Sequence, residues 1–306
     1  MDMWVVLYNL DDEGTSTSEN LLELSLRNLI NLSSVRTSHP PAEHSRIEPV
    51  AERKRFFIDV HRNEFPTWWI AQTEQPINAR ILSISTDAAF CSIWYYDLHA
   101  PKVEVLTLNI RSKDYTLAEF IKRMGQLKVL TIDYPCQLHS LSLMECLSNL
   151  RTIRFQHVSI SSIQLIFALR NTRKLSFVMC EIGNALMTCS TELPYILSNL
   201  TDLEIDMCYD LKEVPSGLCN LVHLQKLSIT NCQELHVLPK GLGSLSDLQF
   251  LSLHCCTKLQ ELPQSIGSLC SLSIIDISDC LSISDLPEEL GELCGLKVLK
   301  MSKLLM

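Results

Sequence analysis

The sequence lacks the features of a membrane-spanning or nucleic-acid-binding protein. No stretch approaches the run of about eighteen apolar residues that a spanning helix requires. The first ten residues contain Asp2 and no basic residue, so they do not form a secretory signal. Basic residues number 26 against 35 acidic ones, a net charge of −9. This acidic excess disfavours binding to a phosphate backbone, so nucleic acid is not expected as a partner.

Motifs for common enzyme chemistry are missing as well. There is no G-x-x-x-x-G-K-[ST] loop, no H-E-x-x-H and no G-x-S-x-G. Gly241-Leu-Gly243 lacks the third glycine of a dinucleotide-binding turn. His254 adjoins Cys255 and Cys256, but we interpret it as a surface-facing strand residue rather than a ligand. We therefore expect no enzymatic activity, no catalytic residue, no metal site and no bound cofactor.

Thirteen cysteines occur without a secretory signal, which favours a reducing compartment. The expected location is therefore the cytoplasm, with the nucleus and the periphery of the plasma membrane as the other options.

Between residues 200 and 299 one sequence pattern occurs four times, and a fifth copy begins. Each copy reads L-x-x-L-x-[IL]-x-x-C-x-x-[LI]-x-x-[LV]-P-x-x-[LI]-x-x-L-x-x, and the interval between copies is constant. The interval lies within the range of about 20–29 residues that is typical of leucine-rich repeats. The L-x-x-L-x-L part predicts a short strand, and the Leu-Pro step predicts the convex return, where a turn of helix can follow. The copies start at Leu200, Leu224, Leu248, Leu272 and Leu296.

Five less regular strands precede these copies, and the interval is longest just before Leu200. Their patterns start at Ala79, Val103, Leu127, Leu150 and Thr172. The predicted fold is thus an α/β solenoid, a leucine-rich-repeat horseshoe of about ten parallel strands, over residues 76–306. Long convex excursions at 133–148 and 181–199 are candidate contact loops.

The two ends of the array carry separate predictions. Residues 39–75 are predicted to be a linker and an N-terminal cover of the solenoid, including the apolar Phe65–Trp69. The array stops without a polar closing repeat, so we expect it to be truncated at its C-terminal end.

Cysteines recur at one position of the repeats. Equivalent positions of stacked repeats form a column rather than a tetrahedral cage, and no C-x-x-C pair accompanies them. A zinc site or a disulfide is the alternative, but the pattern favours a buried ladder of small thiols. The ladder residues are Cys180, Cys208, Cys232, Cys256 and Cys280.

Alternate strand positions point away from the core and form the predicted concave face. The acidic triplet Asp202, Glu204 and Asp206 on this face adjoins a basic patch upstream, Arg154 and Lys174. Such a charge pattern can orient a protein partner. Two apolar residues, Phe250 and Ile274, also favour a contact. The alternative is that these are merely solvated strand positions. The candidate protein-interaction residues are Arg154, Lys174, Asp202, Glu204, Asp206, Lys226, Phe250, His254, Ile274 and Asp276.

Several segments together resemble one known family. They are LSITNC (227–232), DISDCLSISDLPEELGEL (276–293), MCEIG (179–183), ERKRFF (52–57), NARILSIST (78–86), PKVEVLTLNIRSKDYTLAEFIKRMGQLKVL (101–130) and LYNLDDEGT (7–15). They are similar to plant intracellular NB-ARC leucine-rich-repeat disease resistance proteins, and within these to the ADR-like helper subclass that carries an RPW8-type coiled coil. The similarity extends over nearly the full length and suggests a C-terminal fragment.

The resemblance implies that residues 1–38 are a remnant of the winged-helix part of the nucleotide-binding module. The family binds ADP or ATP through a module whose P-loop is absent here, and the RPW8-type bundle is absent too. The expected function is therefore that of an innate-immunity interaction, autoinhibition and signalling module. The implied partners are the family's own nucleotide-binding module and lipase-like signalling heterodimers.

Three alternatives remain open at this point. One is an adaptor that recruits substrates to a ubiquitin ligase, although residues 1–50 supply no convincing F-box-like segment. Another is a non-functional truncated gene product. The third, an extracellular repeat receptor, predicts a signal peptide, paired capping cysteines and L-x-G-x-[IL]-P repeats, none of which occurs in the sequence.

Overall fold

A computed structural model describes most of the chain from residue 55 onward. The described residues are 55–60, 76–88, 98–112, 119–135, 137, 146–160, 169–188 and 190–301. The chain divides into two units, Met1–Glu48 and Pro49–Met306, and all described residues lie in the second. The predicted winged-helix remnant, the predicted cover at Phe65–Trp69 and most of the excursion at 133–148 lie outside the described residues.

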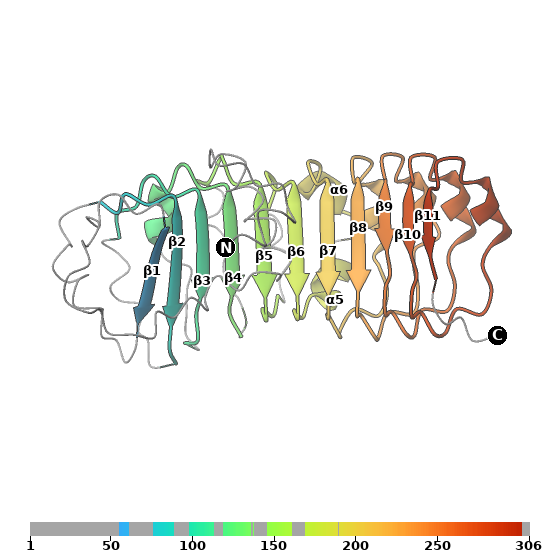
Figure 1. Ribbon diagram of the computed structural model, residues 1–306, viewed down its shortest axis with the longest axis horizontal. Helices are drawn as coiled ribbons and strands as arrows, with labels where there is room; N and C mark the ends of the chain where they lie inside the picture. Colours follow the sequence, from blue (N-terminus) through green and yellow to red (C-terminus); the bar gives the residue numbers. More distant parts are fainter. Residues whose placement is uncertain are drawn as a thin grey trace, which may run out of the picture. The chain divides into compact units, whose positions relative to one another are not determined.

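One parallel sheet organises the described residues, with each strand hydrogen-bonded to the next in chain order (Figure 1). A sheet whose spatial order follows the sequence arises when each repeat contributes one strand and stacks on the previous repeat. The predicted leucine-rich-repeat solenoid is thereby confirmed. The strands are β1 (Arg55–Val60), β2 (Ile81–Thr86), β3 (Val105–Asn109), β4 (Val129–Asp133), β5 (Thr152–Gln156), β6 (Lys174–Val178), β7 (Asp202–Asp206), β8 (Lys226–Thr230), β9 (Phe250–Ser252), β10 (Ile274–Asp276) and β11 (Val298–Lys300).

The strand register matches the predicted repeat spacing. Leu203 of β7 pairs with Leu227 of β8, its equivalent in the next copy of the regular pattern. Leu175 of β6 pairs with Leu203, so the longer repeat between them also keeps its strand in register. The extra residues are therefore accommodated outside the sheet, in the excursion at 181–199.

The sheet begins one strand earlier than the sequence pattern predicts. β1 lies within the stretch predicted as linker and cover, and it pairs in register with β2. Ile58 and Val60 are buried in the same alternation as Leu82 and Ile84. Pattern matching missed β1 because the repeat position ahead of the strand holds Arg53, where the other repeats have an apolar residue or threonine.

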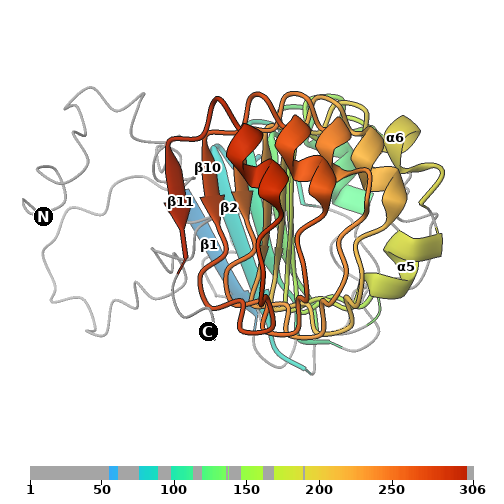
Figure 2. The ribbon, with the colours of Figure 1, turned by 90° about the vertical axis from the view of Figure 1, so that its right-hand side faces the viewer.

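Short helices form the layer opposite the strands, as Figure 2 shows for α5, α6 and the turns that follow the regular strands. Each Leu-Pro or Val-Pro step leads into one of these helical turns; for example, the Leu218 amide donates to the Pro215 carbonyl at 3.1 Å. The predicted helical turn on the return is confirmed. The helices are η3 (Glu119–Arg123), α5 (Gly183–Thr188), α6 (Leu193–Ile196), η5 (Ser216–Asn220), η6 (Leu242–Ser244), η7 (Gln264–Ser268) and η8 (Glu288–Glu292).

The core is a continuous stack of leucine and isoleucine side chains between these two layers. Backbone hydrogen bonds link each repeat to the next before the strand begins. The Arg173 carbonyl, for instance, accepts from the amides of Thr201 (2.8 Å) and Asp202 (3.0 Å). Between β5 and β6 the rings of Phe155 and Phe177 stack with centroids 5.6 Å apart. Burial of apolar side chains shared between repeats stabilises the array, since one repeat alone cannot bury them.

One residue in the turn after each of the strands β5–β10 has a left-handed backbone; it comes directly after β5–β8 and three residues after β9 and β10. These residues are His157, Met179, Met207, Asn231, Cys255 and Asp279, with φ between 52° and 60°. The backbone amides of the first five donate to the next repeat; the Asn231 backbone amide, for example, donates to the His254 carbonyl at 2.9 Å. This turn ends each strand and directs the following ladder residue into the core.

Candidate functional site

The side chains on the solvent side of β5–β10 form the candidate site, which we call the outer sheet face. In β7, Leu203 and Ile205 point into the core, so the alternating residues point outward. The same alternation in β8 buries Leu227 and Ile229. Of the predicted contact residues, Lys174 is exposed, Arg154 is buried, and Asp202, Glu204, Asp206, Lys226, Phe250, His254, Ile274 and Asp276 are partly buried.

Each carboxylate of the acidic triplet in β7 has a polar contact. Asp202 lies 3.9 Å from the Lys174 ammonium and accepts a hydrogen bond from the Thr201 hydroxyl at 2.7 Å. Asp206 accepts from the Thr230 hydroxyl (2.7 Å) and from the side-chain amide of Asn231 (Nδ2, 2.8 Å). These contacts fix the positions of the carboxylates, and the charges of Lys174 and Arg154 partly offset those of Asp202 and Glu204.

Arg154 is not the exposed contact residue that the sequence pattern predicts. Its side chain is only 4% exposed, and its Nη1 donates to Ser176 Oγ (3.3 Å) and Glu204 Oε2 (3.4 Å). Ser176 itself donates to the same Glu204 oxygen at 2.9 Å. Burial lowers the pKa of the Arg154 guanidinium, while the charges of Glu204 and Asp206 oppose this effect.

The register explains why the arginine is covered. Arg154 faces Ser176 across β5 and β6, and Ser176 faces Glu204 across β6 and β7. Because serine is short, the long arginine side chain can extend over it towards a strand about 10 Å away. The alternation of inward and outward residues along β5 predicts that the Arg154 side chain points outward. It does not predict that the side chain extends across β6 towards β7. Arg154 therefore acts as a link between strands rather than as a free cation.

The apolar part of the outer sheet face lies on β8–β10. The Lys226 ammonium lies 5.5 Å from the ring centroid of Phe250, within the range of a cation–π contact. Ile274 of β10 pairs with Phe250 of β9, so the two apolar side chains are neighbours. Together they form a small apolar area, and β8 with Lys226 separates it from the acidic triplet of β7.

Asp276 continues the acidic character of this face. It accepts a hydrogen bond from the Ser278 amide at 3.1 Å and lies 3.6 Å from the Lys300 ammonium. Burial acts to raise the pKa of the carboxyl, but the Ser278 hydrogen bonds and the Lys300 charge outweigh it, so the pKa is lowered. Asp276 therefore stays ionised at neutral pH.

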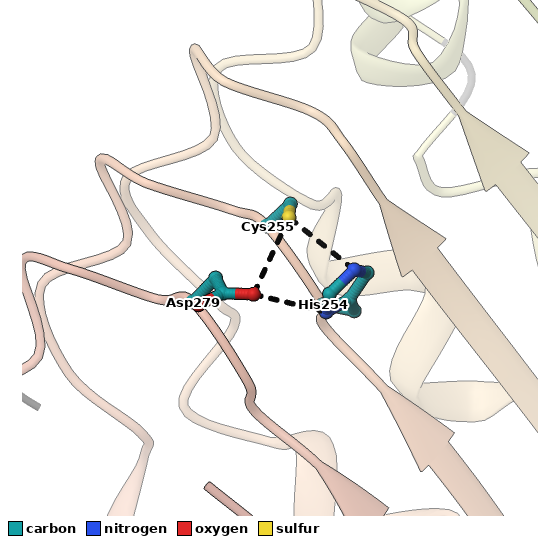
Figure 3. Close-up of side chains that lie close together, drawn as sticks. All are labelled: His254, Cys255 and Asp279. Carbon is teal, nitrogen blue, oxygen red and sulfur yellow. Dashed lines mark hydrogen bonds and ion pairs between the residues drawn. The ribbon is translucent and has the colours of Figure 1, made fainter. Parts of the chain in front are cut away.

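Three potential metal ligands meet at the carboxyl ends of β9 and β10 (Figure 3). Cys255 Sγ lies 3.3 Å from His254 Nε2 and 4.0 Å from Asp279 Oδ2, and His254 Nδ1 lies 3.9 Å from the same oxygen. The sequence pattern draws attention to His254 and Cys255 but not to Asp279. The available signal was the repeat period, which puts Cys255 and Asp279 at equivalent positions of adjacent repeats.

The five ladder cysteines lie in the core, and their thiols are free. Cys256 Sγ donates to the Ile229 carbonyl at 3.3 Å and Cys280 Sγ donates to the Leu253 carbonyl at 2.9 Å, in each case in the preceding repeat. Burial raises the pKa of every ladder thiol, to about 11 for Cys180 and Cys280 and to about 12 for Cys232. The ladder therefore consists of neutral thiols that satisfy strand-end carbonyls.

The excursion at 181–199 presents a second exposed surface. It contains α5 and α6, and the Tyr195 side chain on α6 is 83% exposed. Met187 on α5 is exposed as well. The sequence pattern marks this loop as a contact candidate without predicting its helices.

A shallow polar groove of about 450 Å³ lies on the turns that follow the regular strands. Lys258 pairs with Glu234 across it at 2.6 Å. The sequence pattern gives no signal for this groove. Its lining residues are Lys212, Glu234, His236, Lys258, Gln260 and Ser282.

Among the described residues, no helix has the length and apolar character needed to cross a bilayer.

Comparison with known proteins relates the chain to plant disease resistance proteins. It is 37% identical over 251 residues to Probable disease resistance protein At5g66910 of Arabidopsis thaliana, an alignment covering 74% of this chain and 30% of that protein. It is 30% identical over 236 residues to Disease resistance protein ADR1 of the same plant, covering 70% of this chain and 30% of that protein. The chain thus spans about 30% of the length of these relatives.

No protein-family model matches the sequence. Among solved structures, a chain in the Toll–Spatzle complex of Drosophila aligns with a TM-score of 0.54 and 14% identity, covering 81% of this chain and 40% of that chain. At this identity the similarity concerns the fold alone. Together with the sequence relatives and the repeat sheet, it identifies the chain as a leucine-rich-repeat homologue of plant disease resistance proteins.

Proposed function

We propose that this chain is a protein-interaction module in plant disease resistance, and that the outer sheet face of β5–β10 is its contact surface. The observation that carries the proposal is the combination, on one rigid sheet, of an acidic triplet in β7 with the apolar neighbours Phe250 and Ile274. Interfaces commonly place an apolar centre within a polar rim, and fixed charges select the partner and its orientation.

Homology to disease resistance proteins supports the biological setting. The Toll–Spatzle complex, which contains a related fold, is a molecular hub in Drosophila development and innate immunity. The described cysteines are all free thiols, which supports a reducing location such as the cytoplasm. A stacked array presents a broad surface rather than a closed catalytic pocket, which favours binding over catalysis.

The proposed partners are the nucleotide-binding module of the family and its lipase-like signalling heterodimers. Binding to the first would keep a receptor inactive, and binding to the second would transmit a signal. An acidic face requires a basic patch on either partner, so the association rate should fall as the salt concentration rises.

A pull-down from plant cells tests whether the chain binds at all. The bait is the full 306-residue chain, shown by circular dichroism to be folded. The proposal expects capture of the nucleotide-binding module or of the lipase-like heterodimer. A folded bait that captures neither would contradict the proposal and would favour a gene product without this function.

A further inference from the structure

The His254, Cys255 and Asp279 side chains place three different ligand atoms around one point (Figure 3). All three ligand atoms lie within 4.8 Å of one another. Tetrahedral coordination with bonds of about 2.0–2.3 Å places ligand atoms about 3.3–3.8 Å apart. The distances from Sγ, 3.3 Å to His254 Nε2 and 4.0 Å to Asp279 Oδ2, are close to these values. The other ring nitrogen, Nδ1, is the one that lies 3.9 Å from Asp279 Oδ2, so the imidazole must rotate for a single nitrogen to bind with the other two ligands.

The repeat architecture holds these side chains together. Cys255 and Asp279 lie three residues after the ends of β9 and β10, in adjacent repeats, and both have a left-handed backbone with φ of 58° and 60°. The Cys255 amide donates to the Ser278 carbonyl at 2.9 Å, which fixes one turn against the next. Other repeats share this turn, but their residues there, such as Met179 and Met207, offer no such ligand set. Within the part of the chain that the structure describes, this is the one cluster of its kind.

The local charge also favours a cation. The carboxylates of Asp279 and Asp276 both lie near the Cys255 thiol. These carboxylates make the site electrostatically negative, and a divalent cation would offset that potential and stabilise the thiolate.

We propose that His254, Cys255 and Asp279 bind one zinc ion at the carboxyl ends of β9 and β10. A thiolate, an imidazole and a carboxylate suit zinc and exclude the hard, oxygen-seeking Mg²⁺ and Ca²⁺. The His254 and Asp279 side chains are 41% and 40% exposed, so the fourth coordination position is open to water. The proposal is independent of the proposed protein-interaction function.

The chain has thirteen cysteines, so other thiols compete with Cys255 for a metal ion. The structure shows which of the described thiols are accessible. The ladder thiols are buried in the core, and Cys256 and Cys280 donate to backbone carbonyls, so these thiols are not accessible to a metal ion. Cys146, Cys270 and Cys294 are exposed, which makes Cys270→Ser the matched control for Cys255→Ser.

The test is a titration of the full, reduced chain with Co²⁺, followed by displacement with Zn²⁺. We expect one equivalent of Co²⁺ to produce the near-ultraviolet charge-transfer band of a cobalt–thiolate bond. Cys255→Ser should abolish this band, and His254→Gln and Asp279→Asn should each weaken Zn²⁺ binding at least about tenfold. Cys270→Ser should bind like the wild type.

Folding of the variants is checked by circular dichroism. Cys255→Gly provides a second removal of the sulfur, because glycine suits the left-handed backbone at this position. Absence of the cobalt–thiolate band in the wild type would overturn the proposal. So would equal metal binding by the wild type and either folded Cys255 variant, or loss of binding in Cys270→Ser.

Discussion

At the scale of single residues, the column of cysteines is a structural feature of the repeat core. The thiols are small enough to fit behind each left-handed turn, and they donate to carbonyls at the strand ends of the preceding repeat. The constant repeat period was sufficient to predict their column, because equivalent positions of stacked repeats must coincide. Which carbonyl each thiol would contact depends on the turn geometry, and a sequence pattern does not specify that geometry.

Because burial raises their pKa values, the ladder thiols should make stability depend on alkaline pH. The Cys232 thiol has a pKa of about 12 in the folded chain, against about 8.5 when unfolded. Its contribution is fully present below the unfolded value and is lost as pH rises towards the folded value. Between pH 7 and 10 the free energy of unfolding should fall by about 1–2 kcal/mol for this thiol. Urea unfolding of the wild type and Cys232→Ala at both pH values measures the difference.

Cys232→Ala is expected to be less stable at pH 7, since it leaves a small cavity, but to lose less stability at pH 10. Removing the exposed Cys270 thiol by Cys270→Ala serves as the control, with no change in the pH dependence expected. Parallel pH profiles for the wild type and Cys232→Ala would show that the thiol does not contribute in this way.

The buried Arg154 leads to a second prediction at the residue scale. Glu204→Gln removes the anion that accepts hydrogen bonds from Arg154 and Ser176. The variant should lose about 1–2 kcal/mol in free energy of unfolding, because Arg154 stays buried beside a neutral group. Asp202→Asn, at a partly exposed ion pair of 3.9 Å, should change stability by less than about 0.5 kcal/mol. Equal losses in the two variants, measured by urea unfolding, would argue against a linking role for Arg154.

At the scale of elements, hydrophobic alternation predicted β2–β11 because most of their inward residues are leucine, isoleucine or phenylalanine. It missed β1, where the apolar residue that opens the pattern is absent, and it missed α5 and α6. Those helices lie in the longest repeat, whose extra residues follow no repeating pattern. Periodicity predicts repeated elements well, because each copy can be compared with the others. An insertion that occurs only once has no second copy in the chain with which it can be compared.

The left-handed turns after β5–β10 lead to a prediction at this scale. Met179 has φ 52° and an exposed side chain, and methionine adopts this backbone at a cost of about 1 kcal/mol. Asparagine tolerates the same backbone, as Asn231 does in a later repeat. Met179→Asn should therefore raise the free energy of unfolding by about 0.5 kcal/mol in urea unfolding. Met187→Asn, an exposed position within α5, is the control and should give no gain. A gain in both variants, or in neither, would contradict this account.

At the scale of the whole molecule, the sequence was sufficient for the fold and for the direction in which most outer-face residues point. It was not sufficient for their surroundings, as Arg154 shows. His254 is partly exposed at the surface, as the sequence predicted, but it lies in the turn after β9 rather than in the strand, and there the structure brings it together with Cys255 and Asp279. Contacts between neighbouring repeats depend on side-chain length and turn geometry, and both are invisible in a pattern that records only residue type and spacing.

The structure also improves the design of a binding test. Reversing the charge of the whole acidic triplet would place a lysine beside the buried Arg154 and would destabilise the sheet. Asp202→Lys with Phe250→Ala avoids this problem, because it changes the charge and the apolar area without removing Glu204. Glu261→Lys with Val237→Ala is the matched control, since both residues are exposed and lie outside the strands of the main sheet.

The most direct test of the central claim is a calorimetric titration of the full chain with a partner captured in the pull-down. The account predicts that Asp202→Lys/Phe250→Ala weakens binding at least about tenfold, while Glu261→Lys/Val237→Ala binds like the wild type. Unchanged affinity in the first variant, with both variants folded, would contradict the assignment of the outer sheet face as the contact surface.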